Sequence, residues 1–434
     1  MASSGILPGE PIYTTPPKRN GNNEAITHTN DAVLIFLRSA VRNGDYIIRE
    51  IKEDIPFGNV AATLLKNKTL KDAWKSVTQL AATTTNKSEG LMYLPIAAFL
   101  TLLANPSLSR TDTNGSEITK LFIPWDRVTR ADESERLRQD IIAVEATLVE
   151  TWSFLKDPSW NTLPKRYLDG HNNPRIYYSD IHFIIEVKAK AAAASNIKED
   201  VLQLIKYFFT ASRYQPRHAA YRGVLAYRDG FITVHYFPDI AVYSQTYKWK
   251  DKVALNVLAD LFNTQLPFTT KEFRSCIVSE HEWLGNISSR LQYTSGNNVY
   301  QLFDLFHGLG WNRNTYIGLG IPMGTGVNKS RDCRVFKHGW YDIRRSTNEY
   351  EVLKHIFHPA DGKKRCTAGI IRPDLELCRI IKDSEEVPEL FDADNEEIPA
   401  RDDIVVSFKT IGETLASCRS VRQFLMAMYD LVEG

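Results

Sequence analysis

The sequence predicts a multidomain α+β protein with a helical N-terminal region, a central α/β core and a strand-rich C-terminal part. Three observations predict this. The 434-residue chain is long enough for two or three domains. Its 43% hydrophobic and 24% charged residues are an ordinary globular mixture that can bury a sizeable core. Helix-like apolar stripes near the N-terminus give way to short strand-like runs from residue 177 onward.

Charge and cysteine content exclude several classes of protein. Lys and Arg total 53 against 52 Asp and Glu, so any nucleic-acid surface must be local. The 5 cysteines are scattered without a Cys-x-x-Cys pair, which argues against a structural zinc site or a disulfide framework. The sequence contains no signal-peptide pattern and no run of about 20 apolar residues. We therefore expect a cytoplasmic or nuclear protein that is not secreted and does not contact a membrane.

The N-terminal part is predicted to hold a disordered tail and a helical region. Residues 1–30 are rich in Pro, Gly, Asn and Thr, a composition typical of disorder. In region 31–132, an apolar stripe runs from Ala32 to Val41, and Leu91 to Leu103 is a more apolar run suited to burial between helices. This helical region offers no residues to which we can assign chemistry.

The central region, residues 133–275, is predicted to form an α/β domain. Its first helix is expected at Glu133 to Leu155, because apolar residues recur there at helical spacing. A strand and a second helix follow, and Asp-Gly at positions 229 and 230 marks a hairpin turn between two strand-like runs. These later elements are the strand Tyr177 to Lys190, the helix with Gln203 and Tyr207, the strands Tyr221 to Tyr227 and Phe231 to Phe237, and the helix Val253 to Leu261.

A charged pair on the first of these strands suggests chemistry. Glu186 and Lys188 are two residues apart, so they project to the same side of a strand. Charges on an apolar strand need a partner. A carboxylate can ligate Mg²⁺, and a lysine beside it can offset charge on a phosphate. The alternative is an internal ion pair of Glu186 with Lys188, while Gln203 and Tyr207 pack their helix.

This order of residues resembles nucleases of the PD-(D/E)xK class. In that class an acid precedes E-x-K on the next strand, and RecB-like members add Q-x-x-x-Y on the following helix. The resemblance implies a magnesium-dependent DNA nuclease. It implies a catalytic set of Asp169, Glu186, Lys188, Gln203 and Tyr207, with Asp169 and Glu186 as metal ligands.

The first acid of the set is chosen by distance. Asp180 lies on the same strand as Glu186, and six residues at about 3.3 Å each would separate them by about 20 Å, too far to share one ion. Asp169 lies on a separate segment that can fold back toward the strand. The proline of the family pattern is replaced by Leu168 at this position.

A second pattern begins near Tyr300. A strand there runs into a glycine turn at Gly308 and Gly310, a later strand carries Lys337, and a helix carries Glu349. Glycines let a backbone approach phosphate oxygens, a strand lysine reaches the nucleotide phosphates, and a helix glutamate holds that lysine. The order of these parts resembles the N-lobe of a protein kinase.

Each of these kinase-like parts also has another interpretation. Arg313 occupies the third glycine position of G-x-G-x-x-G. The segment from Ser346 to Glu349 is a capping box, in which the glutamate would satisfy its own helix terminus. For Lys337, a surface ion pair is the alternative to nucleotide contact.

Together, the two patterns resemble the fungal-type protein kinase family, in which an E-x-K strand and a Gln-bearing helix precede a kinase domain. The resemblance covers about Trp160 to the C-terminus and implies ATP and Mg²⁺ as ligands, with Gly308, Gly310, Lys337 and Glu349 at the nucleotide. No H-R-D or D-F-G occurs in the sequence, so the serine/threonine kinase machinery is incomplete. Residues 276–434 are therefore expected to form a truncated kinase-like domain, with an acidic insertion loop at 383–403.

Three functions are consistent with these patterns. We expect first a pseudokinase-like protein that acts by binding a nucleotide or an unidentified protein partner. An interaction or decoy protein with two relic sites is the second, and a nuclease that acts on nucleic acid is the third.

Overall fold

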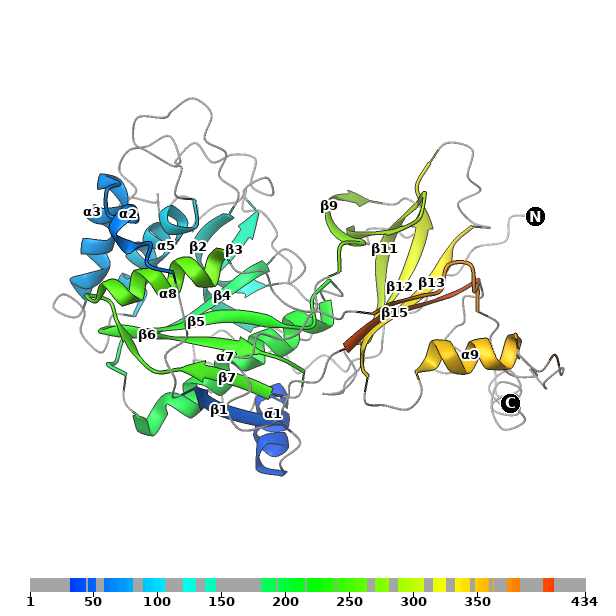
Figure 1. The fold of residues 1–434 in the computed structure, drawn as a ribbon, viewed down its shortest axis with the longest axis horizontal. Helices are drawn as coiled ribbons and strands as arrows, with labels where there is room; N and C mark the ends of the chain where they lie inside the picture. Colours follow the sequence, from blue (N-terminus) through cyan, green and yellow to red (C-terminus); the bar gives the residue numbers. More distant parts are fainter. Residues whose placement is uncertain are drawn as a thin grey trace, which may run out of the picture.

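The computed structural model describes the following residues: 32–43, 46–51, 58–80, 89–105, 120–129, 137–145, 181–192, 194–214, 217–238, 240–263, 270–280, 288–307, 315–324, 332–343, 348–358, 362, 373–382 and 401–409. They form two β-sheets with helices packed against them, one sheet from each half of the chain (Figure 1). The protein is therefore mixed α+β, as the sequence predicts.

The first sheet has the strand order β1-β7-β6-β5-β4-β3-β2, with β8 paired to β6. The pairs β1/β7 and β4/β5 are parallel, and the other neighbours are antiparallel. The strands are β1 (Ile47–Ile51), β2 (Lys120–Thr129), β3 (Leu137–Glu145), β4 (Ile181–Lys188), β5 (Tyr221–Tyr227), β6 (Gly230–Tyr236), β7 (Ile240–Ser244) and β8 (Tyr247–Lys248).

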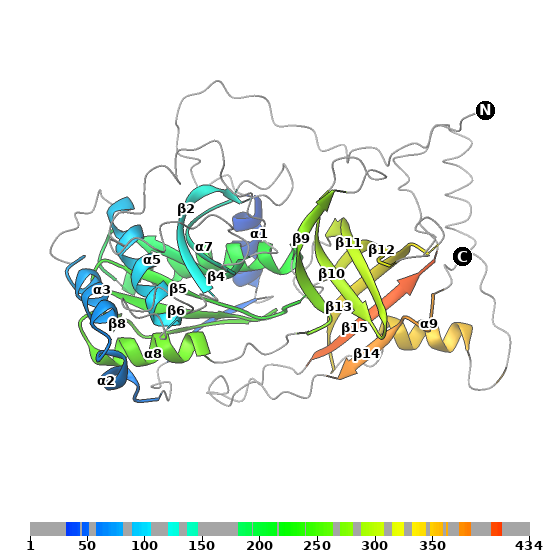
Figure 2. The ribbon, with the colours of Figure 1, turned by 90° about the horizontal axis from the view of Figure 1, so that it is seen from above.

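Helices cover both faces of this sheet (Figure 2). One apolar cluster joins the sheet to α1 (Ala32–Asn43) and α7 (Ala194–Tyr214). The other joins it to α2 (Ala61–Leu64), α3 (Lys68–Thr78), α5 (Gly90–Ala104) and α8 (Lys252–Asn263). Along β4, Ile184 packs into the first cluster and Ile185 into the second, so the central strands are buried on both sides.

The predicted helix from Glu133 to Leu155 is wrong within its described part, because residues 137–145 form strand β3. Ile141 and Val144 favour strands, and β3 is paired on both sides, by β2 and β4. Since both faces are buried, the apolar residues do not alternate, and a short apolar run of this kind cannot be told from a buried helix by its spacing. Region 31–132 is likewise not wholly helical, because it supplies the edge strands β1 and β2.

The other predicted elements of the central region are confirmed where they are described. β4 carries Glu186 and Lys188, and α7 carries Gln203 and Tyr207. β5 and β6 form the antiparallel hairpin that turns at Asp229, with Ala226 opposite Phe231. Local signals were sufficient here because the hairpin turn and the helix that follows β4 each have a sequence signature of their own.

The second sheet is antiparallel throughout, in the order β14-β15-β13-β12-β11-β10-β9. Helix α9 (Glu349–Phe357) follows β13 in the chain and packs its Leu353 against Ile404 and Val406 of β15. The strands are β9 (Phe273–Glu280), β10 (Ser288–Ser295), β11 (Asn298–His307), β12 (Thr315–Pro322), β13 (Arg334–Asp342), β14 (Arg379–Lys382) and β15 (Arg401–Phe408).

The acidic loop predicted at 383–403 ends earlier than expected, because residues 401–403 belong to β15. Asp403 is 1% exposed, and its Oδ1 lies 2.8 Å from Nε2 of His338 on the neighbouring strand. Arg379 lies on its other side, with Nη2 3.8 Å from Asp403 Oδ2. These partners lower the pKa of Asp403 despite its burial, so a charged residue is accommodated inside the sheet. Residues 383–400 lie outside the described part of the chain.

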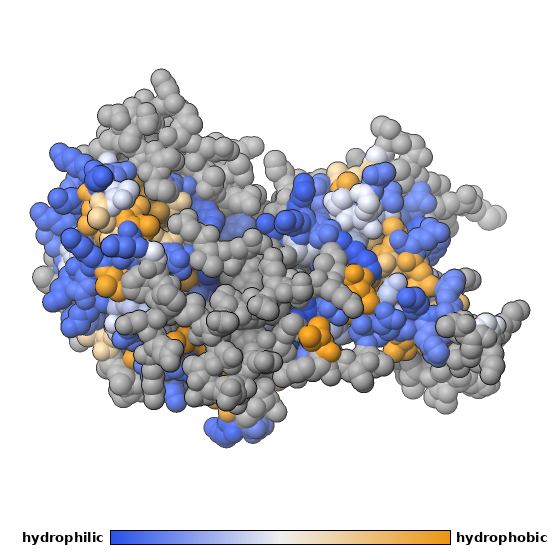
Figure 3. Space-filling view, viewed as in Figure 1, coloured by the Kyte–Doolittle hydropathy of each residue, from blue (hydrophilic) through white to orange (hydrophobic). Residues whose placement is uncertain are grey.

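The surface seen in Figure 3 is largely hydrophilic over the described residues, with scattered apolar groups. Exposed large apolar side chains include Leu91 at 66% and Ile343 at 54%. Single apolar side chains of this kind are ordinary on globular surfaces. Among the described helices, none has the length and apolar character needed to cross a membrane.

Candidate functional site

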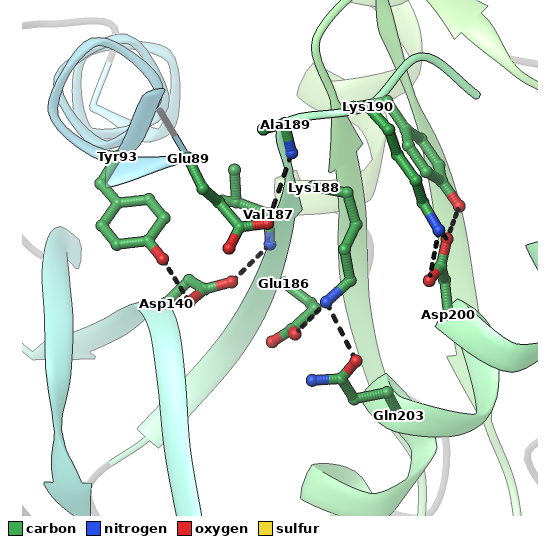
Figure 4. A network of polar contacts seen from close by, with 11 residues as sticks. Glu89, Tyr93, Asp140, Glu186, Val187, Lys188, Ala189, Lys190, Asp200 and Gln203 are labelled. Atoms are coloured by element: carbon green, nitrogen blue, oxygen red, sulfur yellow. Dashed lines mark hydrogen bonds and ion pairs between the residues drawn. The ribbon is translucent and has the colours of Figure 1, made fainter. Parts of the chain in front are cut away.

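Polar side chains converge at the C-terminal end of β4 (Figure 4). Strand β3 brings Asp140 to this place, because Ile141 pairs with Ile185 and the next residues along the two strands are Asp140 and Glu186. Helix α7 contributes Gln203, and the start of α5 contributes Glu89 and Tyr93. Strands β3 and β4, helices α5 and α7, and the bend after β4 therefore meet at one site.

The charged pair predicted on β4 is present. Lys188 donates from Nζ to Oε1 of Glu186 at 2.7 Å and to Oε1 of Gln203 at 2.9 Å. The side chains of Lys188 and Glu186 are 15% and 3% exposed. The internal ion pair held open as an alternative is thus observed. Gln203 does more than pack its helix, because its Oε1 also accepts a hydrogen bond from Lys188 Nζ.

Asp140 is the acid that sequence reasoning missed. Its Oδ1 accepts a hydrogen bond from the Tyr93 hydroxyl at 2.7 Å, and its Oδ2 accepts one from the backbone N–H of Val187 at 2.7 Å. The predicted acid Asp169 and the rejected Asp180 both lie outside the described residues. Asp140 was overlooked because its segment was predicted as a helix. The available signal was an acid directly before the apolar run Ile141 to Val144, which precedes the E-x-K strand.

Glu89 supplies a third carboxylate from the residue before α5. Its Oε1 accepts from the backbone N–H of Ala189 at 3.3 Å, which ties the start of α5 to the end of β4. Burial, followed by the charge of Asp140, raises the pKa of Glu89. No local pattern marks this residue, since it adjoins a polar stretch and lies far from Glu186 in the sequence. Only the packing of α5 on the sheet brings it to the site.

The charge of Asp140 raises the proton affinity of Glu89 and Glu186. Burial, reinforced by Asp140, raises the pKa of Glu186 to about 8, although Lys188 acts in the opposite direction. Burial alone would lower the pKa of Lys188, but the neighbouring Glu186, Asp140 and Glu89 raise it instead. Burial and the charge of Asp140 also raise the pKa of Tyr93, so its phenol remains a donor. The site holds more acids than bases and favours a bound cation.

The donor set fits Mg²⁺, which prefers carboxylate oxygens. Buried Oε2 of Glu186 has no hydrogen-bond partner within the described residues. A ligand or a water molecule would satisfy this acceptor. Figure 4 shows the carboxylates of Glu89, Asp140 and Glu186 turned toward the same space. In the described part of the chain, no three His, Cys, Asp or Glu side chains form a ready-made metal site. Metal binding here therefore requires the carboxylates to adjust, beginning with the Glu186–Lys188 pair.

A second ion pair stands beside the site. Lys190 Nζ lies 2.8 Å from Oδ2 of Asp200 on α7, and the Tyr227 hydroxyl donates to the same oxygen at 3.0 Å. Asp200 is buried, whereas the Lys190 side chain is 36% exposed. These bonds join the bend after β4 to α7 and β5, so they hold the neighbouring Lys188 and Gln203 in place from outside.

Tyr207, predicted to act with Gln203, is placed differently. It is 2% exposed and packs in the apolar cluster between α7 and the sheet. The ammonium of Lys206 lies 5.0 Å from its ring centroid. Residues four apart lie on one side of a helix, and for Tyr207 that side of α7 packs in the core.

The second sheet brings Lys337 and Glu349 together. Lys337 Nζ of β13 lies 2.5 Å from Oε2 of Glu349 in the first turn of α9, and each side chain is 30% exposed. The predicted capping box is wrong. Asn348 caps α9 by accepting from the N–H of Glu351 at 2.9 Å, which leaves Glu349 available for the lysine. The predicted glycines Gly308 and Gly310 lie outside the described residues.

Comparison of the chain with protein-family models, with curated proteins and with solved structures finds no match.

Proposed function

We propose that the site at the end of β4 is a magnesium-dependent nuclease site of the PD-(D/E)xK type that hydrolyses phosphodiester bonds in DNA. The observation that carries the proposal is the convergence of Asp140 and Glu186 from neighbouring strands, with Lys188 bonded to both Glu186 and Gln203. Asp140 takes the place of the first acid, which the sequence alone had assigned to Asp169.

Each side chain has a part in this chemistry. Asp140 and Glu186 would hold Mg²⁺, with Glu89 close enough to add negative charge. The bound ion would activate a water and offset charge on the phosphate. Lys188 is placed to orient that water and to stabilise charge that develops on the phosphate oxygens. Gln203 would hold the lysine in the site through its own hydrogen bond if Glu186 became a metal ligand.

Proton release is a necessary part of metal binding in this proposal. Burial and the charge of Asp140 raise the pKa of Glu186 to about 8, so its carboxyl takes up a proton more readily than that of a free glutamate. A metal ligand must be deprotonated. Glu186 would therefore release any bound proton to become a ligand, and the lysine beside it would stabilise the resulting carboxylate.

The test is DNA cleavage by the full chain. Supercoiled plasmid and linear duplex are incubated with Mg²⁺ or Mn²⁺, and the wild type is compared with Asp140→Asn and Glu186→Gln. We expect cleavage by the wild type and its loss in both variants. Asp72→Asn, which changes an exposed carboxylate on α3, is the matched control and should cleave normally. Cleavage unchanged in Glu186→Gln, or none by the wild type with either metal, contradicts the proposal.

A second candidate function is nucleotide binding at the second sheet, as a relative of the fungal-type protein kinases. Its support is the Lys337–Glu349 pair between a strand and the helix that follows it, the contact that active protein kinases require at the nucleotide phosphates. A thermal-shift titration with ATP and Mg²⁺ tests it. Stabilisation that is lost in Lys337→Ala and kept in Lys354→Ala is expected, and the absence of any shift excludes it.

The remaining alternative is an interaction or decoy protein in which both sites are relics. It becomes the better account if neither DNA cleavage nor an ATP-dependent thermal shift is found. Its positive mark is a protein partner in pull-downs that is retained in the double variant Glu186→Gln, Lys337→Ala.

A further inference from the structure

We infer that Tyr93 is a positioning residue that orients the Asp140 carboxylate for the metal ion. This inference rests on the proposed nuclease function and adds a residue outside the predicted catalytic set. Tyr93 donates to Oδ1 of Asp140 at 2.7 Å, the same distance at which the Val187 N–H approaches Oδ2. Each oxygen of the carboxylate is thus bonded by a donor from a different element, and the plane of the carboxylate is fixed.

The position of Tyr93 on α5 brings its hydroxyl to Asp140. Tyr93 is four residues after Glu89, so both side chains lie on one face of the first turns of the helix. The aromatic ring is half-buried and packs against the apolar cluster between α5, α8 and the sheet. The ring is therefore held by packing while only its hydroxyl enters the polar site (Figure 4).

Hydrogen bonds behind a ligand tune how well it binds metal. A carboxylate oxygen has two lone pairs, so Oδ1 of Asp140 can accept from Tyr93 and still face a cation. Without the phenol, Asp140 would keep its bond to the Val187 N–H but could turn about it. Removal of such an orienting partner typically costs about 10- to 100-fold in metal affinity or activity.

The test is a calorimetric titration of Mn²⁺ into the full-length protein. We expect Tyr93→Phe to bind Mn²⁺ about 10- to 100-fold more weakly than the wild type. The variant removes one oxygen atom and keeps the packed ring. Tyr341→Phe is the matched control, since Tyr341 of the second sheet donates to a carboxylate of α9, Glu349, at 3.4 Å. This control should bind Mn²⁺ like the wild type.

Two further readouts separate positioning from a structural role. The melting temperature of the metal-free protein reports the contribution of the bond to folding. The dependence of DNA cleavage on Mn²⁺ concentration should shift in Tyr93→Phe, and saturating metal should restore most of the rate. Equal Mn²⁺ affinity in Tyr93→Phe and the wild type overturns the inference, even if the melting temperature falls.

The outcomes also distinguish this inference from the proposed function. If the wild type binds no Mn²⁺, both are wrong. If it binds Mn²⁺ and Tyr93→Phe weakens binding but no DNA is cleaved, the positioning role stands and the nuclease function falls. If DNA is cleaved and Tyr93→Phe has wild-type metal affinity, only the positioning role is wrong.

Discussion

The site at the end of β4 and the Lys337–Glu349 pair of the second sheet each pair a lysine with a glutamate, but in different surroundings. Glu186 is 3% exposed and has two more carboxylates as neighbours, whereas Glu349 is 30% exposed. Burial of the first pair costs folding free energy, because buried charges lose their hydration. A partly exposed pair such as Lys337–Glu349 carries less of this cost and contributes little. The pair in the first sheet is therefore the one whose burial and neighbouring charges favour a ligand.

The largest expected effect is on DNA cleavage. Asp140→Asn and Glu186→Gln should each lower the rate by about a hundredfold or more, because metal charge stabilisation is worth several kcal/mol and 1.4 kcal/mol is tenfold. Single-turnover cleavage of a labelled duplex measures this. Lys337→Ala should leave the rate unchanged. Equal losses in Glu186→Gln and Lys337→Ala would remove the contrast between the two sites.

A smaller effect is expected on the way folding stability depends on pH. Burial raises the folded-state pKa of Glu186 from 4.5 to about 8, so the folded protein holds a proton that the unfolded chain releases between these values. This group is therefore expected to reduce stability as pH rises through that window. Glu186→Gln cannot titrate, so its melting temperature should gain on the wild type from pH 5 to about 8. A constant difference across this range contradicts the raised pKa.

Protonation of Glu186 should also make metal affinity depend on pH. A metal ligand must be deprotonated, so if Glu186 is a ligand, apparent affinity for Mg²⁺ or Mn²⁺ should increase with pH up to about 8 and then level off. Titrations at a series of pH values measure this dependence. Affinity that is flat from pH 6 to 8 would show that Glu186 is not a ligand.

The Lys190–Asp200–Tyr227 bonds should contribute to stability more than to chemistry. Asp200→Asn weakens two hydrogen bonds to a buried carboxylate, each worth about 1.5–3 kcal/mol when a charged group takes part. Chemical denaturation measures the free energy of unfolding. We expect a clear loss of stability with cleavage retained at temperatures where the variant is folded. Loss of cleavage without loss of stability would place Asp200 in the catalytic set.

The smallest effect is expected at the second sheet. Lys337→Ala removes a half-exposed ion pair and should change the free energy of unfolding by less than about 1 kcal/mol. Urea denaturation, with Lys354→Ala as the reference, measures it. A loss of several kcal/mol would show that Lys337 is a structural residue of the sheet, and the contrast between the two pairs would then be wrong.

Prediction from sequence succeeded where a signal is local. The Asp229-Gly230 turn and the strand-like runs beside it fix the β5/β6 hairpin, and the spacing of Glu186 and Lys188 places both on one side of β4. The Lys337–Glu349 contact was also predicted, from the kinase-like order of a strand lysine and a helix glutamate that follow one another in the chain. In each case, neighbouring sequence is sufficient to place the residues.

Prediction failed where partners come from distant segments. Asp140 lies on a strand that is buried on both faces, and its apolar spacing imitates a helix. Glu89 and Tyr93 reach the site only because α5 packs on the sheet, a long-range contact that no local pattern encodes. Tyr207 was assigned to the site by resemblance to the Q-x-x-x-Y motif, whereas packing places it in the core.

The most direct test of the account is a Mn²⁺ titration followed by electron paramagnetic resonance at pH 8, on the wild type and on Asp140→Asn. We expect the wild type to bind Mn²⁺ and Asp140→Asn to bind it far more weakly, with Asp72→Asn like the wild type. Binding of equal strength in the wild type and Asp140→Asn, or no binding by the wild type, would contradict a metal site at the end of β4.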